Sequence, residues 1–170
     1  MGKRPDCAAI HEFVANQRAV SISHDPSDDK PVQLVATDGQ VVGRTGSNDQ
    51  QFDEGVWLEL LRDGLTFDLS GLAPGDTLSF PKVEHRFDLS ELPRAESFEV
   101  LRLSPGPHLA GGERTLPVAK AMIALARDLV HYFPDLEAVV WPPAQSAIGR
   151  RFFESVTTAW LDGGAFPALG

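Results

Sequence analysis

Residues 116–141, LPVAKAMIALARDLVHYFPDLEAVVW, are the most regular stretch of the chain and decide its fold class. Apolar side chains recur every three to four residues over 116–133, which predicts a helix with Pro117 tolerated in its first turn. The apolar run 136–141 predicts a strand after a short turn. The helix has an apolar stripe of Val118, Met122, Leu125, Leu129 and Tyr132, and a second stripe of Lys120, Ala124, Arg127 and His131.

The residues on either side of this stretch continue the alternation of strands and helices. A strand over 97–103 precedes it, and Pro142 and Pro143 end it. Ser146 is then expected to cap a second helix over 147–161. Because such a series packs as helices against a sheet, we predict an α+β fold with a mixed, mostly antiparallel sheet and two to three helices packed on it.

The first hundred residues predict one short helix and several strands. Asp38-Gly39 separates the β-rich runs 32–37 and 40–44, and it predicts a type I′ hairpin because both turn positions of that type need positive φ. The other expected elements are a helix over 7–16 capped by Asp6 and strands over 19–23, 65–70, 78–80 and 83–88.

Residues 51–63 are compatible with two kinds of structure. Phe52, Val56 and Leu60 are spaced by four, which favours a helix that Gly64 would end. Gly55 weakens the helix, and a strand over 56–61 is the alternative.

Composition limits the classes of function. The chain has 170 residues and a formal net charge of −9 at pH 7, and this acidity argues against binding to phosphate backbones of nucleic acids. Cys7 is the one cysteine, so neither an intrachain disulfide nor a CxxC metal site can form. No apolar run reaches transmembrane or signal-peptide length, so we expect a cytoplasmic protein that does not bind membranes.

The whole chain, 1–170, is expected to form a single α+β domain, since no segment has the composition of a linker. Its last residues, 165–170, are apolar and follow directly after a predicted helix. Two explanations stay open: this end docks on the core, or the sequence is a fragment of a longer chain.

No motif predicts catalytic residues, a metal or a cofactor. The chain lacks GxSxG and HExxH, and no two histidines have the spacing of zinc ligands. Cys7 and His11 are one helical turn apart, but a nucleophile so near the end of the chain would be poorly held. The acidic run 24–29 lacks the spacing of a calcium loop and is expected to be a solvated loop.

The most suggestive group of polar residues lies where the predicted strand ends and the next helix begins. This is a common place for ligands in α/β sheets, and two arginines near a helix N-terminus would favour an anionic partner. An internal carboxylate such as Glu154 could fill the same role. The candidate ligand-binding residues are Trp141, Gln145, Ser146, Arg150 and Arg151, with His108 joining them if the 105–108 loop lies beside the turn.

Residues 97–164 resemble bacterial families of unknown function. The resemblance lies in the run 103–109, LSPGPHL, the Ala/Leu-rich helix, the strand LEAVVW at 136–141 and the helix that ends at Trp160. In those families an edge strand, a helix and a V-x-W strand recur. The resemblance implies no reaction, cofactor or catalytic residue.

Two functions follow from these observations. The absence of a catalytic signature and the acidic surface favour a non-catalytic binding or protein–protein interaction module, with a protein partner that is basic if charge decides. The alternative is a binding protein or enzyme for a small anionic molecule, with its site at the turn between Trp141 and Arg151. This alternative requires a pocket at the turn into which Arg150 or Arg151 points.

Overall fold

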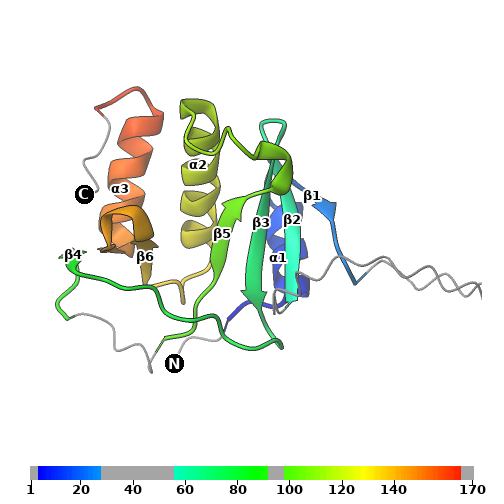
Figure 1. Ribbon diagram of the computed structural model, residues 1–170, viewed down its shortest axis with the longest axis horizontal. Helices are drawn as coiled ribbons and strands as arrows, with labels where there is room; N and C mark the ends of the chain where they lie inside the picture. The colour runs from blue at the N-terminus through cyan, green and yellow to red at the C-terminus, as the bar shows by residue number, and fades with distance from the viewer. Residues whose placement is uncertain (1–3, 28–55, 92–97, 166–170) are drawn as a thin grey trace, which may run out of the picture.

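The computed structural model describes residues 4–27, 56–91 and 98–165, and it has the predicted α+β architecture. Three helices accompany a four-stranded antiparallel sheet and a smaller, mixed three-stranded sheet (Figure 1). The helices are α1 (Cys7–Ala15), α2 (Leu116–Tyr132) and α3 (Arg150–Leu161), joined by the short 3₁₀ helices η2 (Pro107–Leu109) and η3 (Pro142–Ala144). The strands are β1 (Val20–His24), β2 (Val56–Arg62), β3 (Leu65–Leu72), β4 (His85–Phe87), β5 (Arg102–Pro105), β6 (Ala138–Trp141) and β7 (Ser146–Gly149).

The four-stranded sheet has the order β1-β2-β3-β5, and helices α1 and α2 share one hydrophobic core with it. Ile10 and Phe13 of α1 pack in this core with Leu58 of β2 and Leu125 of α2, all without exposed surface. The Phe13 ring also meets the Tyr132 ring edge-on at the end of α2, at a centroid distance of 5.3 Å. This first core therefore ties the start of the chain to the central helix.

The helix expected over 51–63 is wrong, because the described part of this range, from Val56 onward, is strand β2. A spacing of four fits a strand as well as a helix, since residues four apart lie on the same face of both. Leu58, Leu60 and Arg62 are buried in alternation, as a strand requires. Gly64 does not end a helix but forms the β2–β3 turn.

The turn between β2 and β3 explains why the strand ends there. Asp63 has φ of 52° and Gly64 has φ of 77°, so both central residues are in the left-handed region. A two-residue turn of this kind is type I′, whose twist matches that of the paired strands. The same Asp-Gly signal predicts a hairpin at Asp38-Gly39, but the runs 32–37 and 40–44 lie outside the described residues.

The three-stranded sheet has the order β4-β7-β6, with β4 parallel and β6 antiparallel to β7. Ile148 of β7 packs in a second core with Phe153 of α3 and with Ile123 and Val130 of α2. Helix α2 therefore contributes opposite sides to two cores, and it lies between the two sheets in Figure 1.

The expected cap at Ser146 is also wrong, because residues 146–149 form strand β7 and the helix begins at Arg150. Gln145 has φ of 48° and turns the chain from β6 into β7. The Ser146 hydroxyl donates to the Ala144 carbonyl at 3.0 Å, so it does not cap a helix. Gly149 is needed before α3, since a Cβ there would lie 2.2 Å from the Asp88 carbonyl oxygen.

The remaining expectations are mostly confirmed, with shifted ends. Asp6 caps α1, accepting a hydrogen bond from the Ala9 amide at 2.8 Å. The strand expected over 97–103 appears later and shorter as β5, and 83–88 contains the short β4. Residues 78–80, by contrast, form no strand.

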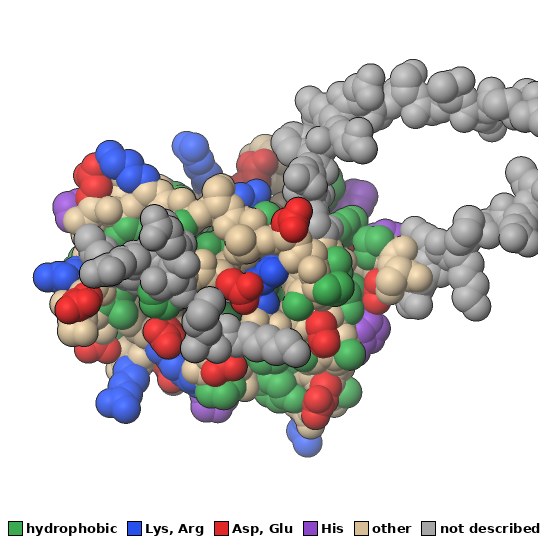
Figure 2. Space-filling model, turned by 90° about the horizontal axis from the view of Figure 1, so that it is seen from below, with side chains coloured by type: hydrophobic (Ala, Val, Ile, Leu, Met, Phe, Trp, Pro, Cys, Tyr) green, Lys and Arg blue, Asp and Glu red, His purple; other side chains and the backbone are tan. Residues whose placement is uncertain are grey.

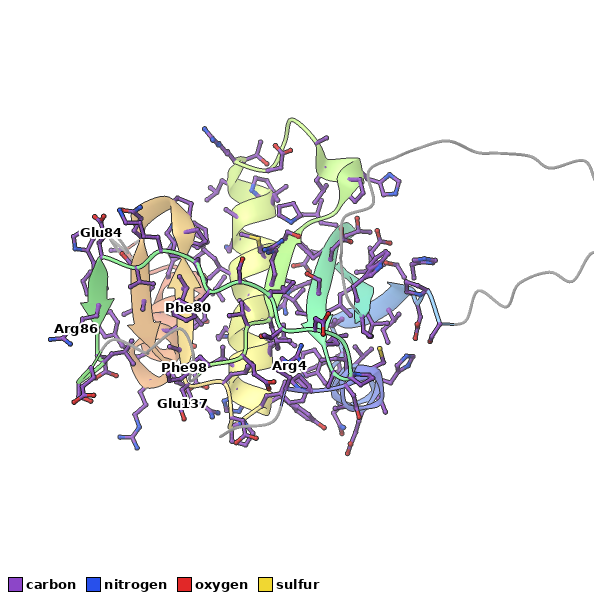
Figure 3. All side chains as sticks on the ribbon, turned by 60° about the horizontal axis from the view of Figure 1, so that its bottom comes forward. Arg4, Phe80, Glu84, Arg86, Phe98 and Glu137 are labelled. Carbon is purple, nitrogen blue, oxygen red and sulfur yellow. The ribbon has the colours of Figure 1, made fainter. Side chains whose placement is uncertain are left out.

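The N-terminal segment is fastened to the exit of β3 by Arg4 (Figure 3). Its guanidinium donates to the carbonyl oxygens of Gly71 at 2.8 Å, Gly75 at 2.7 Å and Asp76 at 3.0 Å. Figure 3 also labels Glu84, which directly precedes the short edge strand β4, and Arg86, the middle residue of that strand. On the face drawn in Figure 2, acidic, basic and apolar side chains are interspersed.

Candidate functional site

The turn between Trp141 and Arg151 uses its polar groups internally. The Gln145 carbonyl oxygen accepts hydrogen bonds from the amides of Glu84, at 2.7 Å, and His85, at 3.1 Å. In the orientation that satisfies its amide, the Gln145 side chain donates to a Glu84 carboxylate oxygen at 3.0 Å. Ser146 is fully buried and Trp141 packs against the second core. These residues close the β6–β7 turn against β4.

The two arginines after this turn do not form a joint anion site. Arg150 donates to the His131 carbonyl oxygen at 3.1 Å, and its Nε lies 3.4 Å from Glu154 Oε1. Its charge is therefore met by an internal carboxylate, which is the outcome that removes the support for a ligand at this turn. Arg151, next to it, is exposed.

His108 does not join this turn. It lies in η2, which follows β5 and contacts β3 of the four-stranded sheet, whereas Trp141 belongs to the other sheet. The amide of Gly106, just before η2, donates to the Thr66 carbonyl oxygen at 2.9 Å and fixes this position. The structure thus brings together the predicted residues from 141 to 151 and leaves out His108.

Cys7, His11 and Asp25 form a second group, with features of both a structural and a catalytic arrangement. His11 Nε2 lies 2.9 Å from Asp25 Oδ2, and the Ser27 amide and hydroxyl donate to Asp25 Oδ1 at 2.8 and 2.6 Å. These hydrogen bonds from Ser27 and His11 lower the pKa of Asp25. Burial, with the negative charges of Asp25 and Asp6, instead raises the pKa of the Cys7 thiol. A raised pKa lowers the fraction of thiolate, which argues against Cys7 as a nucleophile.

Residues 4–27, 56–91 and 98–165 contain neither a cluster of metal-ligating side chains nor a membrane-spanning helix. No three His, Cys, Asp or Glu side chains come together there in a way that could hold a metal ion. None of the helices in these ranges combines the length and the apolar character needed to cross a membrane.

A groove of about 500 Å³ lies elsewhere, between the β2–β3 turn, the first half of α2 and the end of α3. These three parts meet at the top of Figure 1, where α3 ends beside the start of α2. We call this feature the α2–α3 groove. Its charged lining residues are Arg62, Asp63, Lys120, Arg127 and Asp162, and its apolar lining residues are Leu65, Pro117, Ala121, Ala124 and Leu161.

Asp128 holds the two arginines of the groove in place. Its Oδ2 pairs with Arg62 Nη1, and its Oδ1 accepts hydrogen bonds from Nε and Nη2 of Arg127 at 3.0 and 2.8 Å. Only 16% of the Asp128 side chain and 10% of the Arg62 side chain are exposed, so this pairing is shielded from water. Planar guanidinium groups fixed in this way lose little freedom when they bind an anion.

Three donor groups of the groove have no partner among the described residues. They are Nη2 of Arg62, Nη1 of Arg127 and Nζ of Lys120, whereas the buried Nε of Arg62 makes no hydrogen bond and has Asp63 Oδ2 at 3.6 Å. The α2–α3 groove therefore offers one nitrogen from each of two fixed guanidinium groups and one ammonium group. Such charge-assisted donors bind carboxylate or phosphate oxygens.

The sequence indicates the residues that α2 contributes to this groove, but not Arg62. Lys120, Ala124 and Arg127 lie on one face of the predicted helix. A charged face of this kind is typical of the solvent-exposed side of a helix and does not by itself indicate a binding site. Arg62 could not be added to it, because a helix over 51–63 would separate Arg62 from α2. Only the hairpin brings Arg62 to Asp128, which is 66 residues further along the chain.

Comparisons of the chain with protein-family models, with curated proteins and with solved structures found no match. The resemblance of residues 97–164 to bacterial families of unknown function stays a prediction.

Proposed function

We propose that this protein is a non-catalytic binding module that holds an anionic group in the α2–α3 groove. The observation that carries the proposal is the arrangement of Arg62 and Arg127 around the shielded Asp128 carboxylate, with Lys120 unpaired nearby. Asp128 offsets one of these three positive charges, and the carboxylates of Asp63 and Asp162 also line the groove. A bound carboxylate or phosphate group would supply the missing acceptors.

The lining of the groove has features of a binding site. Its residues include no serine, threonine, cysteine or histidine, and the groups that could do acid–base chemistry there are the Asp63 and Asp162 carboxylates and the Lys120 amine. Its volume of about 500 Å³ lies within the usual range for small-molecule sites. The groove also combines apolar surface with a few polar groups, as such sites do.

The proposal moves the anion site away from the turn between Trp141 and Arg151. It keeps the preferred class of function, a binding module, and the anionic ligand of the alternative. A basic protein partner for the acidic surface stays a prediction, which the groove neither requires nor excludes.

The test is a titration of the purified chain with inorganic phosphate, acetate and hexanoate, followed by amide NMR shifts. We expect shifts that centre on residues 117–127, and affinity reduced about tenfold or more in Lys120→Gln and in Arg127→Gln. The matched control is Arg151→Gln, which removes an exposed arginine outside the groove.

The proposal fails if none of these anions binds. It fails equally if Arg151→Gln weakens binding as much as the two groove variants do, because the effect would then reflect net charge alone. Thermal unfolding of each variant checks that a lost affinity is not a lost fold.

A further inference from the structure

We infer that the ligand of the α2–α3 groove is a small zwitterion, with an anionic end and a cationic end joined by an apolar spacer. The inference rests on the proposed function and adds the chemical class of the ligand. It follows from the charges of both signs that line the groove, the polarity of the two helix ends and the apolar residues that share the lining.

Acidic as well as basic side chains line the groove. Asp162, at the end of α3, makes no ion pair or side-chain hydrogen bond with the described residues. Asp63 is nearer to a cation, but its Oδ2 lies 3.6 Å from Arg62 Nε and its side chain is 65% exposed. An anion alone would be attracted by Lys120 and Arg127 and repelled by Asp162. A ligand with a second, cationic end would satisfy both sides.

The two helices that border the groove contribute partial charges of both signs, one positive helix end and one negative helix end. The groove touches Pro117 in the first turn of α2, where the helix dipole is positive, and Leu161 and Asp162 at the end of α3, where it is negative. No acidic residue lies in the first turn of α2, and no basic residue lies in the last turn of α3. Both helix ends therefore lack a compensating side chain of their own.

Asp162 differs in this respect from the arginines at the other end of α3. Arg150 also lies at an unfavourable end of the dipole, but Glu154 and the His131 carbonyl oxygen compensate it. Asp162 adds a negative charge to the negative end of α3 and pairs with no described side chain, although the positive start of α2 lies beside that end (Figure 1). A cation at this position would interact favourably with both the carboxylate and the helix end.

The rest of the lining is apolar. Ala121 and Ala124 of α2 contribute to it together with Leu65 of β3 and Leu161 of α3. Small side chains on α2 leave room for a chain of methylene groups, which gains free energy from contact with such a surface. The groove thus favours charges separated by a spacer.

The experiment is isothermal titration of the full chain with ω-amino carboxylates of increasing length, from glycine to 6-aminohexanoate. Each zwitterion is compared with its matched acid and amine, such as hexanoate and hexylamine. We expect an optimum at one chain length, where the zwitterion binds about tenfold more tightly than either single-charge analogue. This preference for the zwitterion should disappear in Asp162→Asn and be retained in Asp162→Glu. Asp162→Asn should leave the affinity for hexanoate unreduced.

The failures of the two proposals differ. Suppose that each acid binds as tightly as the zwitterion of the same length, and that Lys120→Gln and Arg127→Gln still weaken the binding of the acid. The inference of a zwitterionic ligand is then wrong, and the proposed anion site remains. If Asp162→Asn keeps the full preference for the zwitterion, the assigned cation side is wrong. If no acid, zwitterion or phosphate binds, the proposed function itself is wrong.

Discussion

Arg62 has two acidic neighbours in different surroundings, and they allow a direct comparison of shielded and exposed ion pairs. Asp128 pairs with Arg62 and Arg127 where water has little access, whereas Asp63 is exposed and 3.6 Å away. Exposed pairs contribute little to stability, but removing one partner of a shielded pair leaves an uncompensated charge.

We therefore expect Asp128→Ala to lower the free energy of unfolding by about 2–4 kcal/mol, because two guanidinium groups lose their common carboxylate. Asp63→Asn, the matched control, removes the charge but keeps a residue type that tolerates the left-handed conformation, and it should cost about 0.5 kcal/mol or less. Urea unfolding followed by circular dichroism measures both values. Equal effects of the two substitutions would contradict the shielding of Asp128 and with it the fixed geometry of the groove.

Asp25 gives the molecule a pH dependence whose direction follows from its hydrogen bonds. Ser27 and His11 stabilise the carboxylate and lower its pKa in the folded state. The unfolded chain has the ordinary pKa of about 3.9, so this contribution to stability is fully present above that pH. It is lost as the pH falls through the lower pKa of the folded state.

The measurement is the melting temperature of the native chain and of Asp25→Asn across about pH 2 to 6. We expect the native chain to be more stable near pH 6 and the difference to shrink as the pH falls. Ser27→Ala should give a smaller change of the same kind, since His11 remains. A difference that stays constant with pH would show that the charge of Asp25 is not involved.

The element that depends most on a single backbone conformation is the hairpin of β2 and β3. Gly64 has φ of 77° and nothing within 4 Å of a Cβ built on it, so a side chain there would meet conformational strain but no clash. The left-handed region costs other residues about 1–2 kcal/mol. We expect Gly64→Ala to lower the free energy of unfolding by about 1 kcal/mol.

Gly112→Ala serves as the control, because Gly112 does not have positive φ and its Cβ would make an ordinary contact at 3.4 Å. It should change the free energy of unfolding by about 0.5 kcal/mol or less. If the two glycines respond alike in thermal unfolding, the type I′ turn is not what fixes the hairpin.

Elements with an unambiguous period could be predicted from the sequence, and those with an ambiguous one could not. The apolar stripe of α2 places it correctly at 116–132, and Asp6 marks the start of α1. For β2, the spacing of Val56 and Leu60 fits both a helix and a strand. The Asp63-Gly64 turn was the signal that could have decided between them, since it follows the rule applied to Asp38-Gly39.

The start of α3 was missed for a different reason. Ser146 is a good capping residue by type, but it is buried in a strand that pairs with β6, just before it in the chain, and with β4, far earlier. This pairing overrides a local capping preference of about 1 kcal/mol, and the β4 part of it leaves no signal near residues 146–149.

At the scale of the whole molecule, the candidate site is a product of topology. Its cations come from Arg62 in the first sheet and from Lys120 and Arg127 in the central helix, and its free carboxylate comes from Asp162 after α3. A sequence motif collects neighbouring residues, as the turn between Trp141 and Arg151 does. A groove assembled from three distant segments leaves no such motif, so only its α2 stripe could be seen in advance.

The same central helix couples the two cores. Leu125 packs in the first core and Ile123 in the second, so unfolding of either core would expose one side of α2. We expect Phe153→Ala, which removes a side chain of 3% exposure from the second core, to lower the free energy of unfolding of the whole chain by about 3–4 kcal/mol. The first core should melt with the second even though no atom in it has been changed.

The three tryptophans make this prediction measurable. Trp57 lies in β2 of the four-stranded sheet, whereas Trp141 and Trp160 pack against the second core. In Phe153→Ala, replacing Trp57 by Phe leaves fluorescence that reports the second core, and replacing Trp141 and Trp160 leaves fluorescence that reports the first. Coincident urea transitions in the two proteins are expected, since α2 cannot keep one side packed while the other is exposed. If Trp57 instead reports a transition at higher urea than Trp141 and Trp160 do, α2 stays folded on the first sheet alone, and the two cores are independent.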